Sequence, residues 1–208
     1  MANRLVIFGA GGHAKVVADA ARLIGFELIG FVDHEPRLQG TRVLGMPVVG
    51  DEHELKAFDH ASCAVIVAVG DNAQREALVE RLMSQDMSFA TIIHPSAVIS
   101  SPAALGDGTV VLAGAVVNSG AVVGCHCIVN TMASVDHDCV IDDFTHLSPG
   151  VHLAGGCRLG RSVHVGIGAC VVPNCSIGAR TIVGAGAAVT QNIPSDVTAI
   201  GVPARVLE

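Results

Sequence analysis

Hydrophobic positions divide this chain into two parts with different periods. Up to about residue 95, short apolar runs alternate with helix-like segments, whereas every sixth residue from Ile99 to Val189 is Ile, Leu or Val, sixteen positions in succession without an insertion. A second position, four residues after each of these aliphatics, is mostly small. A fixed period of this kind predicts a solenoid built from six-residue units.

The six-residue register also predicts the cross-section of the solenoid. Two inward positions per hexad, one branched and one small, suit a narrow triangular prism whose three faces take one hexad each. Three hexads make an 18-residue coil, so the run holds about five coils. We therefore expect an all-β left-handed parallel β-helix over residues 96–208. The register also makes four of the seven cysteines small interior residues, namely Cys127, Cys139, Cys157 and Cys175.

The first part, residues 1–95, has the pattern of a Rossmann-like half domain. Apolar runs predict strands at 4–8, 27–32 and 64–69, and the segments 15–24 and 74–83 have helical character. Strands that alternate with helices imply a parallel sheet, with ligands held beyond the carboxyl ends of the strands. Those ends are the glycine loop at residues 9–13, Asp33, and residues 70–72.

The glycine loop matches the pattern GxGxxA, and Asp33 stands where an acid that binds ribose would stand. A complete dinucleotide domain uses two mononucleotide halves, and only about 95 residues precede the repeats. One half suits a mononucleotide, such as the nucleotide part of an activated sugar. In the alternative interpretation, the glycines only permit a tight turn from strand to helix.

Composition and charge exclude several classes of partner. The formal net charge is -7 and charged residues make up 15% of the chain, so a basic surface for nucleic acid is not expected. No apolar run approaches the roughly 20 residues that a membrane span requires, and no secretory signal pattern opens the sequence. The odd number of cysteines lacks zinc-like spacing. We expect a soluble cytoplasmic protein with reduced thiols, no membrane partner and no metal.

Three histidines stand out by their place in the repeat. His137 falls at a corner of the prism and faces outward, with Ser119 and Gly155 one coil before and after it. An imidazole between two small residues leaves room for a ligand, although an ordinary exposed turn histidine is the alternative. His146 and His164 are 18 residues apart, so they should be stacked neighbours on one face. They do not predict a metal site, because the next positions in that column are Ile128 and Ile182.

Several motifs together resemble one bacterial enzyme family. They are the opening GAGGHAKVV, the AVGDN loop, the segment SVDHDC at residues 134–139 and the closing GVPAR. This combination resembles the hexapeptide-repeat acetyltransferases that act on nucleotide-linked amino sugars. That family includes UDP-4-amino-sugar and GDP-perosamine N-acetyltransferases and proteins described as sialic acid O-acetyltransferases. The resemblance covers nearly the whole chain and implies a homotrimer that binds acetyl-CoA between neighbouring prisms.

The resemblance also implies roles for particular residues. His137 matches the catalytic histidine of the family, and Asp138 takes the place of the acidic residue that follows it. The resemblance implies an acetyl-CoA site with contributions from His146, Gly155, Gly166, Ile167 and Ala185. It implies that the nucleotide sugar is anchored by Gly11, Gly12, His13, Asp33, His34 and Gly70, with the sugar pointing toward His137 of a neighbouring subunit.

The chemistry that follows is direct acetyl transfer. An amine must lose a proton as it attacks a thioester, and a neutral imidazole with a pKa near ~6.5 can accept that proton. Either Asp136 or Asp138 can orient the imidazole. The function predicted is N-acetylation of a nucleotide-linked amino sugar, of the 4-amino-4,6-dideoxy type, for surface glycan biosynthesis. O-acetylation of a sugar such as sialic acid and a non-catalytic nucleotide-binding trimer are the alternatives. The choice among UDP, GDP and CMP stays open.

Overall fold

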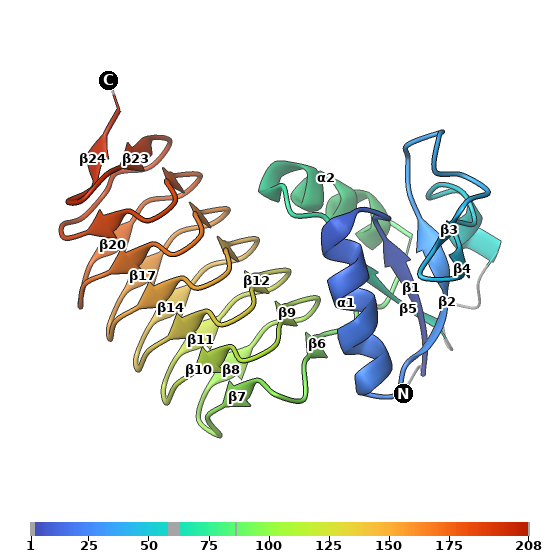
Figure 1. The fold of residues 1–208 in the computed structure, drawn as a ribbon, viewed down its shortest axis with the longest axis horizontal. Helices are drawn as coiled ribbons and strands as arrows, with labels where there is room; N and C mark the ends of the chain where they lie inside the picture. Colours follow the sequence, from blue (N-terminus) through green and yellow to red (C-terminus); the bar gives the residue numbers. More distant parts are fainter. Residues whose placement is uncertain (1–2, 58–62, 86, 208) are drawn as a thin grey trace. The chain divides into compact units, whose positions relative to one another are not determined.

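The computed structural model describes residues 3–57, 63–85 and 87–207. The chain divides into two compact units, residues 1–95 and residues 96–208 (Figure 1).

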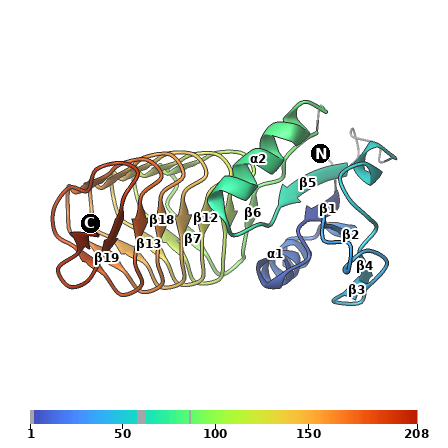
Figure 2. The same ribbon diagram turned by 90° about the horizontal axis from the view of Figure 1, so that it is seen from above.

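Unit 1 is built on a three-stranded parallel sheet in the order β2-β1-β5. Its strands are β1 (Arg4–Phe8), β2 (Glu27–Val32) and β5 (Cys63–Val67), and its helices are α1 (Gly12–Leu23) and α2 (Asn72–Met83). The helices lie on opposite faces of the sheet (Figure 2). Because β5 is wholly buried and β1 nearly so, both strands are continuous apolar runs. The predicted Rossmann-like half domain is confirmed.

Both helices begin earlier than the hydrophobic pattern predicts. Helix α1 starts at Gly12 rather than at residue 15, and α2 starts at Asn72 rather than at residue 74. The first turn of α2 is fixed by its cap, because the Asp71 carboxylate accepts a hydrogen bond of 2.8 Å from the backbone N–H of Gln74. Caps and glycines carry no apolar periodicity, so the pattern misses the first turn.

Smaller elements complete the unit. Strands β3 (Arg42–Val43) and β4 (Met46–Pro47) form an antiparallel hairpin, η1 is a single 3₁₀ turn (Glu54–Ala57), and β6 (Ile92–Ile93) follows α2. None of them was predicted from the sequence, because two-residue strands are too short to show a period.

Unit 2 is the predicted left-handed parallel β-helix, which confirms the expected fold class. Its strands form three sheets, in which strands one coil apart are parallel neighbours. Sheet I contains β7 (Val98–Ile99), β10 (Val116–Val117), β13 (Ser134–Val135), β16 (His152–Leu153), β19 (Cys170–Val171) and β22 (Ala188–Val189). Sheet II contains β8 (Ala104–Leu105), β11 (Val122–Val123), β14 (Val140–Ile141), β17 (Arg158–Leu159) and β20 (Ser176–Ile177). Sheet III contains β9 (Val110–Val111), β12 (Ile128–Val129), β15 (His146–Leu147), β18 (His164–Val165), β21 (Ile182–Val183), β23 (Thr198–Ile200) and β24 (Arg205–Val206).

The interior of the prism follows the six-residue register. Within the regular coils the second residue of each strand points inward and is buried, as at Val135 and Leu153, and the small position of each hexad lies between strands. A bridge between Ile177 and Ile193 and the pairing of β21 with β23 extend the solenoid to about six coils, slightly more than the five expected. Strand β24 then turns back antiparallel to β23.

The corners of the prism need a left-handed backbone at every sixth residue. Glycine meets this need at several coils, but Met132, Asp138 and Phe144 adopt a φ of 59° at the same register. Side chains at these positions cost more than glycine would, with Asp and Asn tolerated best. The corner geometry therefore determines the backbone on which His137 and Asp138 stand.

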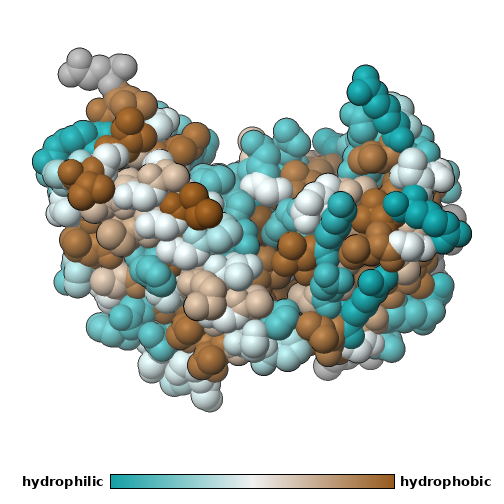
Figure 3. Space-filling view, viewed as in Figure 1, coloured by the Kyte–Doolittle hydropathy of each residue, from teal (hydrophilic) through white to brown (hydrophobic). Residues whose placement is uncertain are grey.

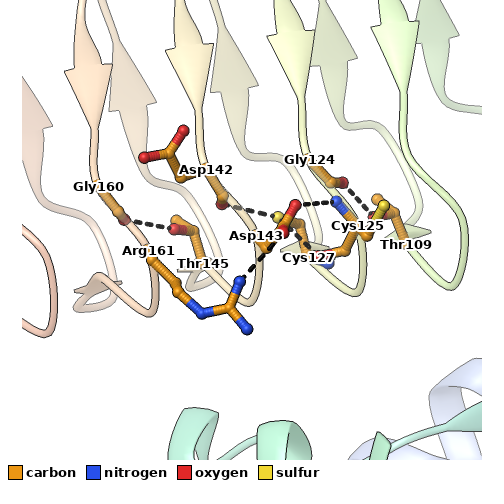
Figure 4. Close-up of polar contacts among 9 residues, drawn as sticks. All are labelled: Thr109, Gly124, Cys125, Cys127, Asp142, Asp143, Thr145, Gly160 and Arg161. Atoms are coloured by element: carbon orange, nitrogen blue, oxygen red, sulfur yellow. Dashed lines mark hydrogen bonds and ion pairs between the residues drawn. The ribbon is translucent and has the colours of Figure 1, made fainter. Parts of the chain in front are cut away.

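Polar contacts between coils reinforce the corner that joins sheets II and III (Figure 4). The Asp143 carboxylate accepts a 2.8 Å hydrogen bond from the backbone N–H of Cys125, one coil earlier, and pairs with Arg161, one coil later, at 3.1 Å. The hydroxyl groups of Thr109 and Thr145 donate to the carbonyls of Gly124 and Gly160. These contacts satisfy polar groups inside the corner and hold successive coils in register.

Candidate functional site

The six residues implied as nucleotide-sugar ligands all line one pocket in unit 1. The pocket has a volume of about 350 Å³, and Gly11, Gly12, His13, Asp33, His34 and Gly70 are part of its wall. The wall also includes Gln74 and Leu78 of α2, which the sequence analysis did not single out. The three strand ends meet here because parallel strands present their carboxyl ends at the same edge of the sheet.

Asp33 organises the glycine loop. Its Oδ2 accepts a hydrogen bond of 2.7 Å from the backbone N–H of Ala10, and its Oδ1 accepts one of 2.9 Å from the N–H of Glu35. Each carboxylate oxygen can still accept another hydrogen bond. Asp33 thus fixes the loop after β1 and keeps acceptor capacity on the pocket wall.

The start of α1 is an open donor surface at this pocket. Gly11 caps the helix without a side chain, the first turn contains no acidic residue, and nothing lies within 4 Å of a Cβ built on Gly11 or Gly12. The free N–H groups and the helix dipole at such an end favour an anion. This end of the pocket is therefore chemically suited to a phosphate group.

His13 contributes a neutral imidazole to the same wall. Burial, and secondly the positive charge of Arg75, lower the pKa of His13 to about 4. At neutral pH the ring is uncharged, so it offers one donor and one acceptor rather than a cation.

His34 is held at the pocket wall by packing and by an acidic residue. Its ring makes an edge contact with Phe8 at 5.1 Å between centroids, and its Nε2 lies 2.9 Å from a carboxylate oxygen of Glu52. The same oxygen of Glu52 accepts a hydrogen bond of 3.2 Å from Arg81. Three groups thus fix the orientation of the His34 ring at the pocket.

In unit 2, His137 stands at the corner between sheets I and II, as its register predicts. Its Nδ1 lies 2.9 Å from Oδ2 of Asp138, and both side chains are largely exposed. A Cβ built on Gly155, one coil later, would lie 2.5 Å from Cε1 and Nε2 of the imidazole. The ring therefore occupies space that only a glycine at position 155 leaves open.

The two neighbouring carboxylates make different contacts. Asp138 contacts the imidazole, whereas Oδ1 of Asp136 accepts hydrogen bonds from the backbone N–H of His137, at 2.8 Å, and from Asn118, at 3.0 Å. The hydrogen bond to Asp138, followed by the charge of Asp136, raises the pKa of His137. Of the two alternatives left open by the sequence, the geometry puts Asp138 on the ring nitrogen.

His146 and His164 are neighbours on one face of sheet III, as predicted, with their rings tilted by 50° to each other. They pair in register between β15 and β18, and their ring centroids are 4.8 Å apart. Ile128 and Ile182 flank them in the same column. His146 is buried, and its Nε2 lies 3.2 Å from the amide nitrogen of Asn130.

The implied acetyl-CoA residues lie on different edges of a single prism. Gly155 stands at the corner between sheets I and II, beside His137. Gly166, Ile167 and Ala185 stand at the corner between sheets III and I, where Ile167 is 57% exposed and a Cβ on Gly166 would contact the backbone of Ala185. The chain thus brings Gly155 to His137 but places the other corner across the width of sheet I.

Two further findings concern metals and membranes. Within residues 3–57, 63–85 and 87–207, no cluster of three or more His, Cys, Asp or Glu side chains is placed to bind a metal ion. Within the same residues, no helix is both long and apolar enough to cross a bilayer.

A hexapeptide β-helix with an outward corner histidine, attached to an α/β unit with a glycine-loop pocket, defines a hexapeptide-repeat acyltransferase. Comparisons with known proteins give a narrower assignment. Residues 4–82 match the family model described as the PglD N-terminal domain. The acetyltransferase domain of PglB from Neisseria gonorrhoeae, solved in complex with acetyl coenzyme A, is 40% identical with a TM-score of 0.93 and full coverage of both chains.

Perosamine N-acetyltransferase from Caulobacter crescentus gives a similar result. A mutant of that protein in complex with CoA and GDP-perosamine is 43% identical over 98% of this chain and 96% of its own, with a TM-score of 0.93. UDP-N-acetylbacillosamine N-acetyltransferase of Bacillus subtilis is 49% identical over 115 residues, which are 53% of this chain and 52% of that protein. The match therefore spans about half the length of this curated relative. The chain belongs to the family of acetyl-CoA-dependent N-acetyltransferases that act on nucleotide-linked amino sugars.

Proposed function

We propose that this chain transfers the acetyl group of acetyl-CoA to the amino group of a nucleotide-linked sugar, with His137 as the general base. The single observation that carries this proposal is the arrangement of His137 between Asp138 and Gly155. An exposed imidazole with one nitrogen on a carboxylate and the other over a glycine is ready to accept a proton from a bound amine.

The proposed reaction is a direct transfer. When the imidazole of His137 is neutral, its hydrogen bond to the Asp138 carboxylate keeps the proton on Nδ1, so Nε2 has the free lone pair. As the amine nitrogen attacks the thioester carbonyl, its proton passes to Nε2. The tetrahedral intermediate then collapses to the amide and breaks the C–S bond, and the departing CoA thiolate takes up that proton from the imidazolium. Base catalysis of this type contributes roughly 10²- to 10⁴-fold.

The pocket in unit 1 is the proposed binding site for the nucleotide. Gly11 and Gly12 would donate backbone N–H groups to phosphate, and Asp33 and His34 would contact the nucleoside. The complexes of relatives with GDP-perosamine support a 4-amino-4,6-dideoxy sugar as the acceptor. We propose that the product enters a surface glycan.

We also propose that the chain acts as a homotrimer with acetyl-CoA between neighbouring prisms. The candidate residues on the two edges of sheet I would then come from two chains, with Gly155 from one and Ile167 and Ala185 from the other. Apolar side chains on the outside of unit 2 are consistent with such contacts. Figure 3 shows apolar side chains gathered at the C-terminal end of the β-helix, where Ile200, Val202, Val206 and Leu207 are exposed.

The cytoplasm is the proposed location, because it supplies acetyl-CoA and keeps thiols reduced. All seven cysteines are free, and Cys139, Cys157 and Cys175 follow one another at 18-residue intervals without forming a disulfide.

The test is thiol release from acetyl-CoA across a panel of UDP- and GDP-linked 4-amino sugars and free sialic acid. His137→Ala removes the base, and His152→Ala removes another exposed histidine of the β-helix as the matched control. Release with one amino sugar that is lost only in His137→Ala supports the proposal. Release only with sialic acid would indicate O-acetylation, and no release in the wild type together with nucleotide binding would indicate a non-catalytic nucleotide-binding protein.

A further inference from the structure

Arg75 is a buried cation that the proposed mechanism does not use. It lies on α2 and is 1% exposed. Its guanidinium donates hydrogen bonds to the carbonyls of Val69 and Gly70, at 2.9 and 3.3 Å, and to the side-chain oxygen of Asn72 at 2.8 Å. A fully buried guanidinium is uncommon in proteins, and this one is held against residues of the pocket wall.

The hydrogen bonds of Arg75 place its charge directly behind the wall of the nucleotide pocket. Val69 and Gly70, whose carbonyls it contacts, both line the pocket. His13 lines it as well, and the charge of Arg75 contributes to the lowered pKa of that histidine. The electric field of the guanidinium therefore acts on groups inside the pocket, where the low dielectric strengthens it.

The pocket lacks a cation of its own on its surface. Among the described residues that form its wall, none is lysine or arginine, and Asp33 contributes a negative charge. A ligand with a diphosphate group would bring two or more negative charges to this wall. The start of α1 offsets part of that charge, but a helix end is equivalent to only about half of an elementary charge.

We propose that Arg75 is a positioning residue that makes this pocket prefer ligands with a high negative charge, such as a nucleoside diphosphate. The guanidinium holds the wall at Val69 and Gly70 and acts on the phosphates through it, without touching the ligand. This inference rests on the proposed nucleotide binding in unit 1. It assigns the charge selectivity of that site to a residue beneath its surface.

The experiment compares ligands that differ only in charge. Affinities of uridine, UMP and UDP, and of guanosine, GMP and GDP, are measured by calorimetry for the wild type, Arg75→Met and Arg75→Lys. Arg22→Met is the matched control, because it removes one positive charge from the other end of the domain's first helix, where Arg22 is exposed and only loosely paired with Asp19. Thermal melting of each variant reports folding.

We expect the wild type to bind the diphosphate more tightly than the nucleoside by a factor on the order of 100. In Arg75→Met this affinity ratio should fall about tenfold. Arg75→Lys should keep the ratio within about threefold, and Arg22→Met should leave it unchanged. Equal losses for nucleoside and diphosphate would reduce Arg75 to a structural residue and overturn the inference. Wild-type protein that binds none of these ligands would instead overturn the nucleotide pocket itself.

A second measurement covers the case in which Arg75→Met does not fold. Arg75→Lys keeps the positive charge but loses the planar guanidinium group. A folded lysine variant that keeps the diphosphate preference supports the inference. A folded lysine variant that loses this preference overturns it. Titration of His13 by NMR in the same variants is independent of any ligand. Its pKa should stay near 4 in Arg75→Lys and rise in Arg75→Met if that variant folds.

Discussion

The imidazole of His137 lies over Gly155, one coil further along the β-helix, in the space that a side chain at position 155 would fill. The distance from a Cβ built there to Cε1 and Nε2 would be 2.5 Å. Because the nitrogen that faces Gly155 is the one not bound to Asp138, the glycine keeps clear the atom that we propose as the base. The 18-residue coil thus places the proposed base beside the residue that makes room for it.

A single methyl group at position 155 should therefore impair catalysis. In Gly155→Ala the imidazole must turn away, which breaks its hydrogen bond to Asp138. Because the ring is exposed and can move, we expect the melting temperature to change little, while kcat falls at least tenfold. NMR titration should show the pKa of His137 returning toward its ordinary value. If kcat and this pKa both stayed at their wild-type values, the contact between His137 and Gly155 would have no functional role.

The pH dependence of the reaction should report the charge of Asp138. Hydrogen bonding to Asp138 raises the pKa of His137, and the protonated ring cannot act as a base. The rate of the wild type should therefore fall on the acid side at a pH above the ordinary histidine value of ~6.5. Asp138→Asn keeps a side chain that tolerates the left-handed corner but removes the charge. We expect its acid limb to move to lower pH, with a plateau rate about tenfold lower because the base is weaker.

The kcat/KM profile of both proteins, measured with saturating acetyl-CoA, checks this prediction. Asp136→Asn serves as a comparison, because Asp136 acts on His137 through its charge and not through the ring nitrogen. Its acid limb should move in the same direction by a smaller amount. Superimposable profiles for the wild type and Asp138→Asn would show that another group limits the rate.

The pocket in unit 1 shows how far the sequence could locate a candidate site. All six residues expected there line one pocket, because the glycine loop, Asp33 and Gly70 follow strands of a parallel sheet and such strands end at one edge. Arg75 and Gln74 were missed. The sequence places both in a helical segment but does not indicate which face of the helix is turned toward the pocket. Arginine is almost never fully buried, so the sequence provides no reason to expect Arg75 in the interior.

The residues implied for acetyl-CoA binding mark the limit of what a sequence period can predict. The six-residue register gives the face or corner of each position, so the pairing of His146 with His164 in adjacent strands follows from the 18-residue spacing and is confirmed. In the proposed homotrimer, the corner of another chain that lies beside His137 would depend on surface complementarity between subunits. A repeat within one chain does not encode that pairing.

Mixed trimers should test the proposed division of the site between chains. His137→Ala removes the base, and Ile167→Asp places a charge on the opposite corner, where the isoleucine is exposed. Each variant alone should be nearly inactive. If the two residues of one site come from different chains, coexpressed and doubly tagged mixtures should recover a substantial fraction of wild-type kcat, since some sites then contain both native residues.

The control for mixed trimers is a double variant, His137→Ala with Ile167→Asp in one chain, mixed with His137→Ala. Those mixtures contain no native His137 and should stay inactive. Coexpressed single variants that gain no activity, although mixed oligomers are isolated, would show that one chain supplies both residues or that Ile167 does not bind acetyl-CoA.

Direct transfer predicts that no cysteine is required. Cys170 is the exposed cysteine of the β-helix and pairs in register with His152, so it is the best placed thiol for a covalent acetyl intermediate. In Cys170→Ala we expect kcat to stay within about twofold of the wild type and no acetylated protein to accumulate. Rapid-quench mass spectrometry with acetyl-CoA alone checks this. An acetyl adduct on the wild type that disappears in Cys170→Ala, together with loss of activity, would replace the direct mechanism.

The corner at Asp143 offers a test of what holds successive coils together. Its carboxylate accepts from the backbone of Cys125 and pairs with Arg161, whose guanidinium also lies 4.6 Å from the centroid of the Phe144 ring. Asp143→Ala leaves a backbone N–H of the corner without this acceptor, which should cost about 1–2 kcal/mol of unfolding free energy. Asp143→Asn keeps an oxygen for Cys125 and loses only a half-exposed ion pair, so its cost should stay below about 1 kcal/mol. Urea unfolding of both variants separates the contributions of the two contacts. If Asp143→Asn were as unstable as Asp143→Ala, the ion pair, rather than the hydrogen bond between coils, would be what stabilises this corner.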